Sequence, residues 1–201
     1  DNYTTIQEAV WAAGVNDTIF VRAGTYVEQI IIRNKRSFTV IGEEPTSTTI
    51  VGIALADCLD GCIQIEGSND ITLKGFKIVP PPRIDVDEAD PTGEKYGTET
   101  GILLWNSQNC TISENIICGF HYNCSSYCGK GLSAGIAFEG STCNVIYENE
   151  IIDGYIGISM SNGGAGHGTL AGNKFNEIYH NNFINNTHHV SGMLGDTILT
   201  R

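Results

Sequence analysis

The sequence has few basic residues and no long apolar run. Lys and Arg number 11 against 23 Asp and Glu, which gives a net charge of −12. Nucleic-acid binding requires basic patches, so this balance argues against DNA or RNA as a partner. A membrane-spanning helix needs about 18 or more consecutive apolar residues, and the sequence contains no such run. The acidic composition suits a solvated extracellular surface or the binding of cations.

Proline is also scarce, whereas glycine is abundant. The 201 residues include 5 Pro and 24 Gly, which suits a single domain with many tight bends. One pattern occurs twice in succession, first over 101–117 and then over 135–151, and weaker copies begin at Gly61 and Gly157. One copy cannot bury its apolar face without neighbouring copies. The recurrence therefore predicts a repeat architecture in which the copies stack.

Each copy contains short alternations of apolar and polar residues, which predict half-buried strands separated by bends. Asn115, Asn149 and Asn181 recur in register, 34 and 32 residues apart. Asparagine tolerates the left-handed backbone of a sharp bend, and Gly75 occupies the equivalent slot of an earlier copy. Stacked asparagines can also hydrogen-bond to one another. We therefore predict that these three residues form a structural ladder.

These copies resemble the repeats of right-handed parallel β-helices, in particular those of pectate lyases and of NosD-type exported surface and periplasmic proteins. The opening of the chain, from Tyr3 to Glu28, is similar to the usual start of such domains. The resemblance implies an all-β fold, with residues 1–201 forming one right-handed parallel β-helix, or solenoid. It implies little about function, because lyases, hydrolases, metal-handling proteins and structural surface proteins share this fold.

Local signals predict how the domain is arranged. Thr5 to Glu8 is a capping box, so a short helix is expected over 4–13, where it would cover the first turn and protect its open edge. The stacked turns are expected over 17–186. Strands are predicted at 17–22, 28–32, 37–41 and from Ile50 onward, with a bend at Gly24 and Thr25. Long loop insertions are predicted at 80–100, 118–133 and 163–174.

The ends of the chain lead to two further expectations. The chain starts at Asp1 and the fold begins almost at once, as expected of a processed mature protein. Segment 187–201 departs from the repeat and predicts a final strand. An uncovered last turn is a template for another chain, so this strand could join subunits end to end. The same segment could instead pair back on its own domain or belong to a truncated chain.

Cysteines and glycosylation sequons together favour an exported, oxidising location, either extracellular or at the cell surface. The disulfide candidates are Cys58, Cys62, Cys110, Cys118, Cys124, Cys128 and Cys143. The glycosylation candidates are Asn2, Asn16, Asn109, Asn123 and Asn185. Because seven cysteines cannot all pair, one is free or bonded between chains. The period of two places Cys110 inward and Cys143 outward, so Cys143 is the candidate for that role.

Three groups of residues contain metal-ligand types, although the fold requires no cofactor. An acidic loop offers hard oxygen ligands suited to calcium, in a spacing that is not an EF-hand: Asp85, Asp87, Glu88 and Asp90. A second loop offers soft ligands suited to zinc, with disulfides as the alternative: Cys118, His121, Cys124 and Cys128. The NosD resemblance suggests copper handling for His188 and His189, but only two methionines, Met160 and Met193, accompany them.

The catalytic residues, if any, are unknown, and the sequence favours a protein that is not an enzyme. Glu114 and Glu148 occupy equivalent positions one turn apart, a spacing compatible with glycoside hydrolysis. Each lies beside a ladder asparagine at a bend, and His180 is the next member, so a solvated column is the simpler interpretation. Two functions remain. One is a structural protein that self-associates into a sheath, surface layer or filament. The other is a carbohydrate-active β-helix: a polysaccharide lyase, a hydrolase or a sugar-binding module.

Overall fold

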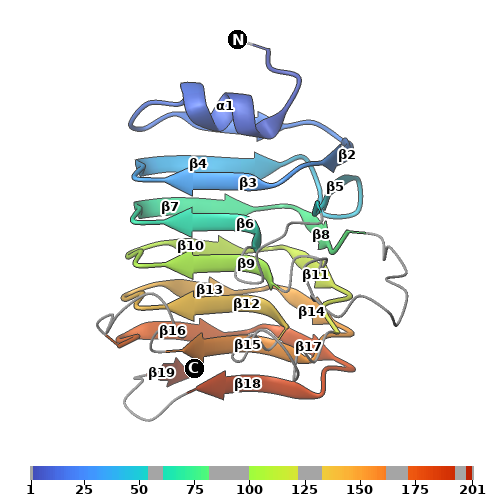
Figure 1. The fold of residues 1–201 in the computed structure, drawn as a ribbon, viewed down its shortest axis with the longest axis vertical. Helices are drawn as coiled ribbons and strands as arrows, with labels where there is room; N and C mark the ends of the chain where they lie inside the picture. The colour runs from blue at the N-terminus through green and yellow to red at the C-terminus, as the bar shows by residue number, and fades with distance from the viewer. Residues whose placement is uncertain are drawn as a thin grey trace, which may run out of the picture.

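The computed structural model describes residues 2–53, 61–81, 100–121, 133–161, 172–192 and 198–200. It is a right-handed parallel β-helix, as predicted, in which the chain winds through three parallel sheets and each turn stacks on the one before (Figure 1). One short helix, α1 (Ile6–Ala12), lies across the N-terminal end of the stack. The three sheets are called sheet A, sheet B and sheet C below.

Each turn contributes one strand to each sheet in the order A, B, C. Sheet A consists of β1 (Thr18–Val21), β4 (Arg36–Gly42), β7 (Asn69–Lys74), β10 (Thr111–Ser113), β13 (Val145–Tyr147), β16 (Asn176–Tyr179) and β19 (Ile198–Thr200). Sheet B consists of β2 (Gly24–Val27), β5 (Thr48–Val51), β8 (Lys77–Val79), β11 (Ile116–Cys118), β14 (Glu150–Ile152) and β17 (Asn182–Ile184). Sheet C consists of β3 (Ile30–Arg33), β6 (Gly61–Glu66), β9 (Thr100–Trp105), β12 (Ala134–Glu139), β15 (Ile156–Ser161) and β18 (His188–Gly192).

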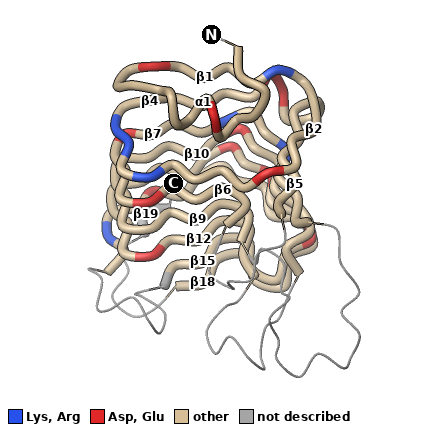
Figure 2. Tube along the Cα trace, turned by 45° about the horizontal axis from the view of Figure 1, so that its top comes forward, with Lys and Arg blue, Asp and Glu red and all other residues tan. Residues whose placement is uncertain are grey.

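The core consists of columns of apolar side chains that point inward from successive turns. In sheet C one such column is made by Ile30, Ile63, Ile102, Ile136 and Ile158, which pair in register and are fully buried. Most charged residues of the described chain lie at strand ends or bends, and the middle of β9, β12, β15 and β18 carries none (Figure 2). Because apolar side chains alternate with polar ones along each strand, one face of the strand is buried against the core. This burial holds each turn against its neighbours.

Helix α1 seals the first turn. The Thr5 hydroxyl caps the helix by accepting from the Glu8 N–H at 3.2 Å, and Ile6, Ala9 and Val10 are buried against the core. The Gln7 side chain accepts from the N–H of Ile31 at 2.6 Å and donates to its carbonyl at 3.1 Å. Gln7 thus satisfies the free edge of β3 as a neighbouring strand would, which protects that edge from pairing with another chain.

The asparagine ladder forms inside the bend between sheets A and B. The Asn115 amide donates to the Asn149 carbonyl oxygen at 3.1 Å, and the Asn149 amide donates to that of Asn181 at 2.9 Å. Asn115 and Asn149 are each only 1% exposed. The amides satisfy one another and also bond to backbone carbonyls, so they replace the water that a buried bend would otherwise need.

The left-handed position of that bend was predicted one residue too late. Glu114, Glu148 and His180 have φ angles of 56°, 54° and 54°, and each directly precedes its ladder asparagine. Gly75 follows Lys74, the partner of Ser113, so it matches Glu114 and not Asn115. The physical reason is that two adjacent polar residues share the bend: the first takes the strained backbone and faces water, and the second turns inward.

A second polar ladder, which we did not predict, lies at the bend that leads into sheet A. The Ser107 N–H donates to the Ser141 hydroxyl at 3.0 Å, and the Ser141 N–H donates to the Asn173 carbonyl oxygen at 2.9 Å. Beside it, the Asn144 amide donates to the Asn176 carbonyl oxygen at 3.0 Å. The repeated serine of each copy is therefore a buried hydrogen-bonding residue as well as a marker of the bend.

Two predicted boundaries were wrong. Gly24 and Thr25 do not form a bend but begin strand β2, and the chain bends at residues 28–29 before β3. The repeat also does not stop at residue 186, because β18 extends sheet C by pairing Ile156 with His188 and Ile158 with Val190. Strand β19 then pairs with β16 of the same chain, with Ile178 opposite Thr200. Segment 187–201 therefore contains two further strands of the same β-helix.

Candidate functional site

The bend between sheets A and B exposes a column of polar side chains. Glu114, Glu148 and His180 are all exposed there, and the Lys74 ammonium group lies 3.0 Å from the Glu114 carboxylate. Tyr147 and Tyr179 stack beside this column with ring centroids 5.4 Å apart. Glu114 already has a cationic partner, and the carboxylates of Glu114 and Glu148 both face solvent. The column therefore lacks the enclosed environment that would make one carboxyl group a general acid and the other a base or nucleophile.

The described cysteines lie in different parts of the fold. Cys62 and Cys110 are buried, Cys118 is half-buried and Cys143 is exposed. The predicted inward Cys110 and outward Cys143 are confirmed, and no disulfide joins two of these four described cysteines to each other. The predicted partners Cys58, Cys124 and Cys128 lie outside the described residues. Burial raises the pKa of the Cys110 thiol to about 11, since the interior disfavours the thiolate.

We expect thiol reagents to distinguish Cys143 from Cys110. At pH 8 only about one in a thousand Cys110 side chains would be a thiolate, and the reagent cannot reach it. In the folded protein, iodoacetamide should therefore modify Cys143 at least about a hundredfold faster, as read by peptide mass spectrometry. In denaturant the two rates should become similar. Comparable rates in the folded protein would contradict the buried position of Cys110.

Within the described ranges, no group of three or more His, Cys, Asp or Glu side chains converges on a common metal position. The His188 ring packs edge-on against Tyr155 at 5.5 Å, whereas the His189 ring stacks on Phe183 at 5.4 Å. The predicted calcium ligands Asp85, Asp87, Glu88 and Asp90 lie outside the described residues, as do Cys124 and Cys128 of the predicted soft-ligand set. No helix in the described part of the chain is long and apolar enough to cross a membrane.

The described glycosylation candidates all face solvent. Asn2, Asn16, Asn109 and Asn185 are exposed, and Asn123 lies outside the described residues. Asn16, Asn109 and Asn185 take left-handed conformations with φ of 67°, 55° and 52°. Asn185 also donates to the Asp153 carboxylate at 2.7 Å. Asn16, Asn109 and Asn185 thus lie at turns or bends of the described chain.

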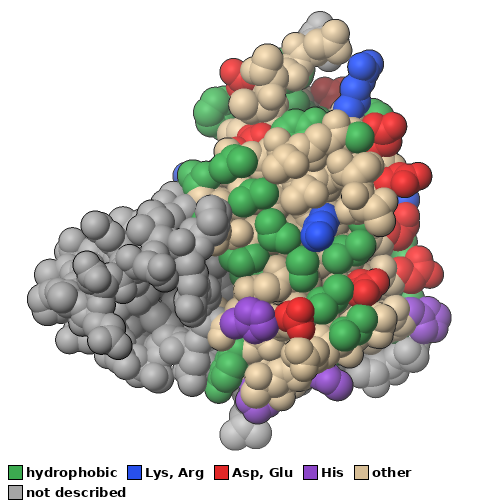
Figure 3. Space-filling view, turned by 90° about the vertical axis from the view of Figure 1, so that its right-hand side faces the viewer, with side chains coloured by type: hydrophobic (Ala, Val, Ile, Leu, Met, Phe, Trp, Pro, Cys, Tyr) green, Lys and Arg blue, Asp and Glu red, His purple; other side chains and the backbone are tan. Residues whose placement is uncertain are grey.

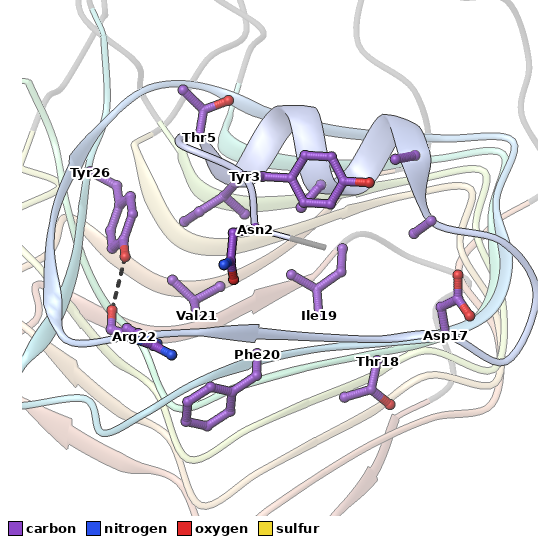
Figure 4. A pocket seen from close by; sticks show the side chains of 14 residues that line it. Asn2, Tyr3, Thr5, Asp17, Thr18, Ile19, Phe20, Val21, Arg22 and Tyr26 are labelled. Atoms are coloured by element: carbon purple, nitrogen blue, oxygen red, sulfur yellow. Dashed lines mark hydrogen bonds between the residues drawn. The ribbon is translucent and has the colours of Figure 1, made fainter.

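A pocket of about 380 Å³ lies between α1 and β1 at the capped end (Figure 4). Tyr3, Ile19 and Val21 line it, and the Tyr26 hydroxyl at one side donates to the Arg22 carbonyl at 3.0 Å. Asp17 is the one carboxylate in the lining, and it already accepts from the Gly14 N–H at 2.7 Å. The described residues that line the pocket therefore offer no paired acid and base for catalysis.

The outer face of sheet B has an unusual composition for a solvent-facing sheet. One outward column is entirely apolar or thiol: Val27, Val51, Val79, Cys118, Ile152 and Ile184. Val27 is 66% exposed and Ile184 38%, at the two ends of the column. Figure 3 shows hydrophobic side chains running down this face, with basic and acidic side chains set among them.

Sequence reasoning missed this face because its strands are short. Ile116 to Cys118 is an apolar run, and such a run looks like a strand buried on both sides. A usable signal was present: the core residues Ile50, Ile78 and Ile151 are each followed by a second aliphatic residue. A strand with one wet face would instead place a polar residue there.

The fold and the repeats define the chain as a right-handed parallel β-helix protein. The family model described as "Periplasmic copper-binding protein (NosD)" matches residues 93–195, about half of the chain. The chain belongs to the NosD family. A search of curated proteins finds no match.

Solved structures with the same fold include carbohydrate-active proteins. An alginate lyase from Paenibacillus sp. is 16% identical with a TM-score of 0.62, over 97% of this chain and 61% of the lyase. A pectin methylesterase from Erwinia chrysanthemi is 11% identical with a TM-score of 0.55, over 92% of this chain and 63% of the enzyme. A pectin methylesterase from Aspergillus niger is 14% identical with a TM-score of 0.52, over 99% of this chain and 80% of the enzyme. At these identities the likeness concerns the fold alone.

Proposed function

We propose that this chain is an exported structural β-helix protein that acts by associating side by side with copies of itself. Export is supported by the periplasmic description of the NosD family and by the acidic net charge of −12. The observation that carries the proposal is the apolar column on the outer face of sheet B. The column is exposed at Val27 and Ile184 and half-buried between them, and an uninterrupted apolar column on an outer sheet face is a candidate interaction site.

The capped end favours lateral association over a head-to-tail filament. Strand pairing at the N-terminal end would have to displace α1, because Gln7 already holds both backbone groups of Ile31. The Glu28 carboxylate further anchors the helix by accepting from the N–H groups of Ile6 and Gln7 at 3.0 and 2.9 Å. A sheath or surface layer built through the sides of the β-helix leaves these bonds intact.

Copper binding and carbohydrate cleavage receive less support. The NosD family description names copper, but His188 and His189 contact separate aromatic rings, and no described cluster of ligands fits a metal. The carbohydrate-active alternative rests on the fold that this chain shares with an alginate lyase and pectin methylesterases. Neither reading has a convergent set of described side chains behind it, whereas lateral association has a continuous surface.

The proposal is tested by sedimentation velocity of the 201-residue chain. The face spans about 24 Å along six strands and about 10 Å across, which suits a weak, reversible interface. We therefore expect association to grow between about 10 µM and 1 mM, and Ile152→Asp to weaken it at least about tenfold. Ser159→Asp, on the outer face of sheet C, is the matched control and should change little. A strict monomer across this range would refute the proposal.

A further inference from the structure

Two opposite charges stand symmetrically on the outer face of sheet B. Beside the apolar column, a second outward column contains Lys77, Ile116 and Glu150 on the consecutive strands β8, β11 and β14. Ile116 pairs with Lys77 on one side and with Glu150 on the other, so the two charges lie about 4.8 Å above and below it. No ion pair of Lys77 or Glu150 occurs within the described ranges.

This arrangement is self-complementary under one particular symmetry. Consider two copies packed face to face through sheet B, related by a two-fold axis that runs parallel to the strands at the level of Ile116. The axis reverses the order of the strands and keeps each column opposite itself. Lys77 of each copy then faces Glu150 of the other, and Ile116 faces Ile116. The apolar column likewise faces itself, with Val79 opposite Ile152.

The other two-fold arrangement leaves the charges unpaired. An axis parallel to the β-helix keeps the order of the strands and exchanges the two columns, which places Lys77 against Val79 and Glu150 against Ile152. Burying a charge against an apolar side chain without a partner is strongly unfavourable. Charge complementarity therefore selects the antiparallel pair, in which the two β-helices run in opposite directions.

We propose that the outer face of sheet B is a homodimer interface in which two copies pack antiparallel, with Lys77 of each copy paired to Glu150 of the other. This inference rests on the proposed function and specifies its geometry. It also places Cys118 of both copies beside the two-fold axis, since Cys118 and Ile116 lie on the same strand. Face-to-face sheets are about 10 Å apart, which is too far for a direct disulfide but suits a short bifunctional linker.

A charge exchange tests the pairing. Lys77→Glu and Glu150→Lys should each weaken association about tenfold or more, because each places like charges opposite one another. The double variant, with both substitutions, should restore association to within about threefold of the original protein. Circular dichroism and thermal melting check that each variant stays folded, as expected because both side chains point outward.

A bis-methanethiosulfonate with a short spacer provides a second, structural readout. In a Cys143→Ser background we expect a linked Cys118–Cys118 peptide pair by mass spectrometry, and we expect its loss in the Cys118→Ser variant. If the original protein associates but the double variant is not restored and no such pair forms, the antiparallel geometry is overturned and the proposed function stands. If the original protein does not associate at all, both fail.

Discussion

Replacing Asn149 with alanine is expected to lower the free energy of unfolding by about 3–5 kcal/mol. The Asn149 amide donates to the carbonyls of Ile112 and Tyr147 at 2.9 and 3.0 Å, as well as to Asn181. Its carbonyl oxygen accepts from the backbone N–H of Asn115 at 3.2 Å. Alanine would leave several buried groups without a partner in a site that is 1% exposed, and each such group costs about 1–3 kcal/mol.

Chemical denaturation followed by circular dichroism measures this loss. The matched control is Asn182→Ala, an exposed asparagine on strand β17, which should change stability by less than about 0.5 kcal/mol. Asn149→Asp adds a sharper test, because aspartate keeps the shape but loses both donors; it too should be strongly destabilising. Equal effects of Asn149→Ala and Asn182→Ala would show that the ladder contributes no more than surface asparagines do.

Gly135→Ala is expected to destabilise the protein by about 2–3 kcal/mol through overpacking. A Cβ atom at this position would lie 2.7 Å from the Ile151 methyl group and 2.9 Å from the Gly157 carbonyl oxygen. Gly101 and Gly157 occupy the same place in neighbouring turns and are equally confined. In the next turn His189 follows His188, the partner of Ile156, and its ring stacks on Phe183. Close packing between sheets B and C therefore requires glycine here in the turns of β9, β12 and β15, whereas the turn of β18 carries His189 at this position.

Gly24→Ala is the glycine control for this substitution. A Cβ at Gly24 would meet only the Tyr26 ring, at 3.4 Å, which is an ordinary contact. Alanine there restricts the unfolded chain without a clash, so stability should be unchanged or rise by up to about 1 kcal/mol. The midpoint of urea unfolding separates the two variants. If Gly135→Ala were as stable as Gly24→Ala, a methyl group would fit at residue 135, which would contradict the predicted clash.

The architecture was predictable because its physics is local and repeated. The spacing of Asn115, Asn149 and Asn181 defined the stack, and the period of two placed Cys110 inside and Cys143 outside. The left-handed residue was misplaced because a spacing does not show which of two adjacent polar residues turns inward. A count of cysteines could not place Cys62, Cys110 and Cys118, because they belong to three different sheets or bends that only the three-dimensional winding determines.

The candidate surface was not predictable in the same way. Outward and inward aliphatic residues are chemically alike, so Val79 and Ile152 could not be distinguished from Ile78 and Ile151 by type. Their difference follows from the register of sheet B, which places one set in the core and the other on the outside. The symmetric positions of Lys77 and Glu150 likewise depend on which strands become neighbours, although they are 73 residues apart in the chain (150 − 77).

At the bend between sheets A and B, a variable outward residue is followed in several turns by the same inward residue. One backbone position at this bend is filled differently in successive turns. It holds an uncharged glycine at Gly75, a carboxylate at Glu114 and Glu148, and an imidazole at His180. The residues directly after Glu114, Glu148 and His180 are all asparagine. Mutation can therefore rewrite the chemistry along this corner turn by turn while the adjacent ladder keeps the turns in register. Such a corner lets the surface evolve independently of the fold.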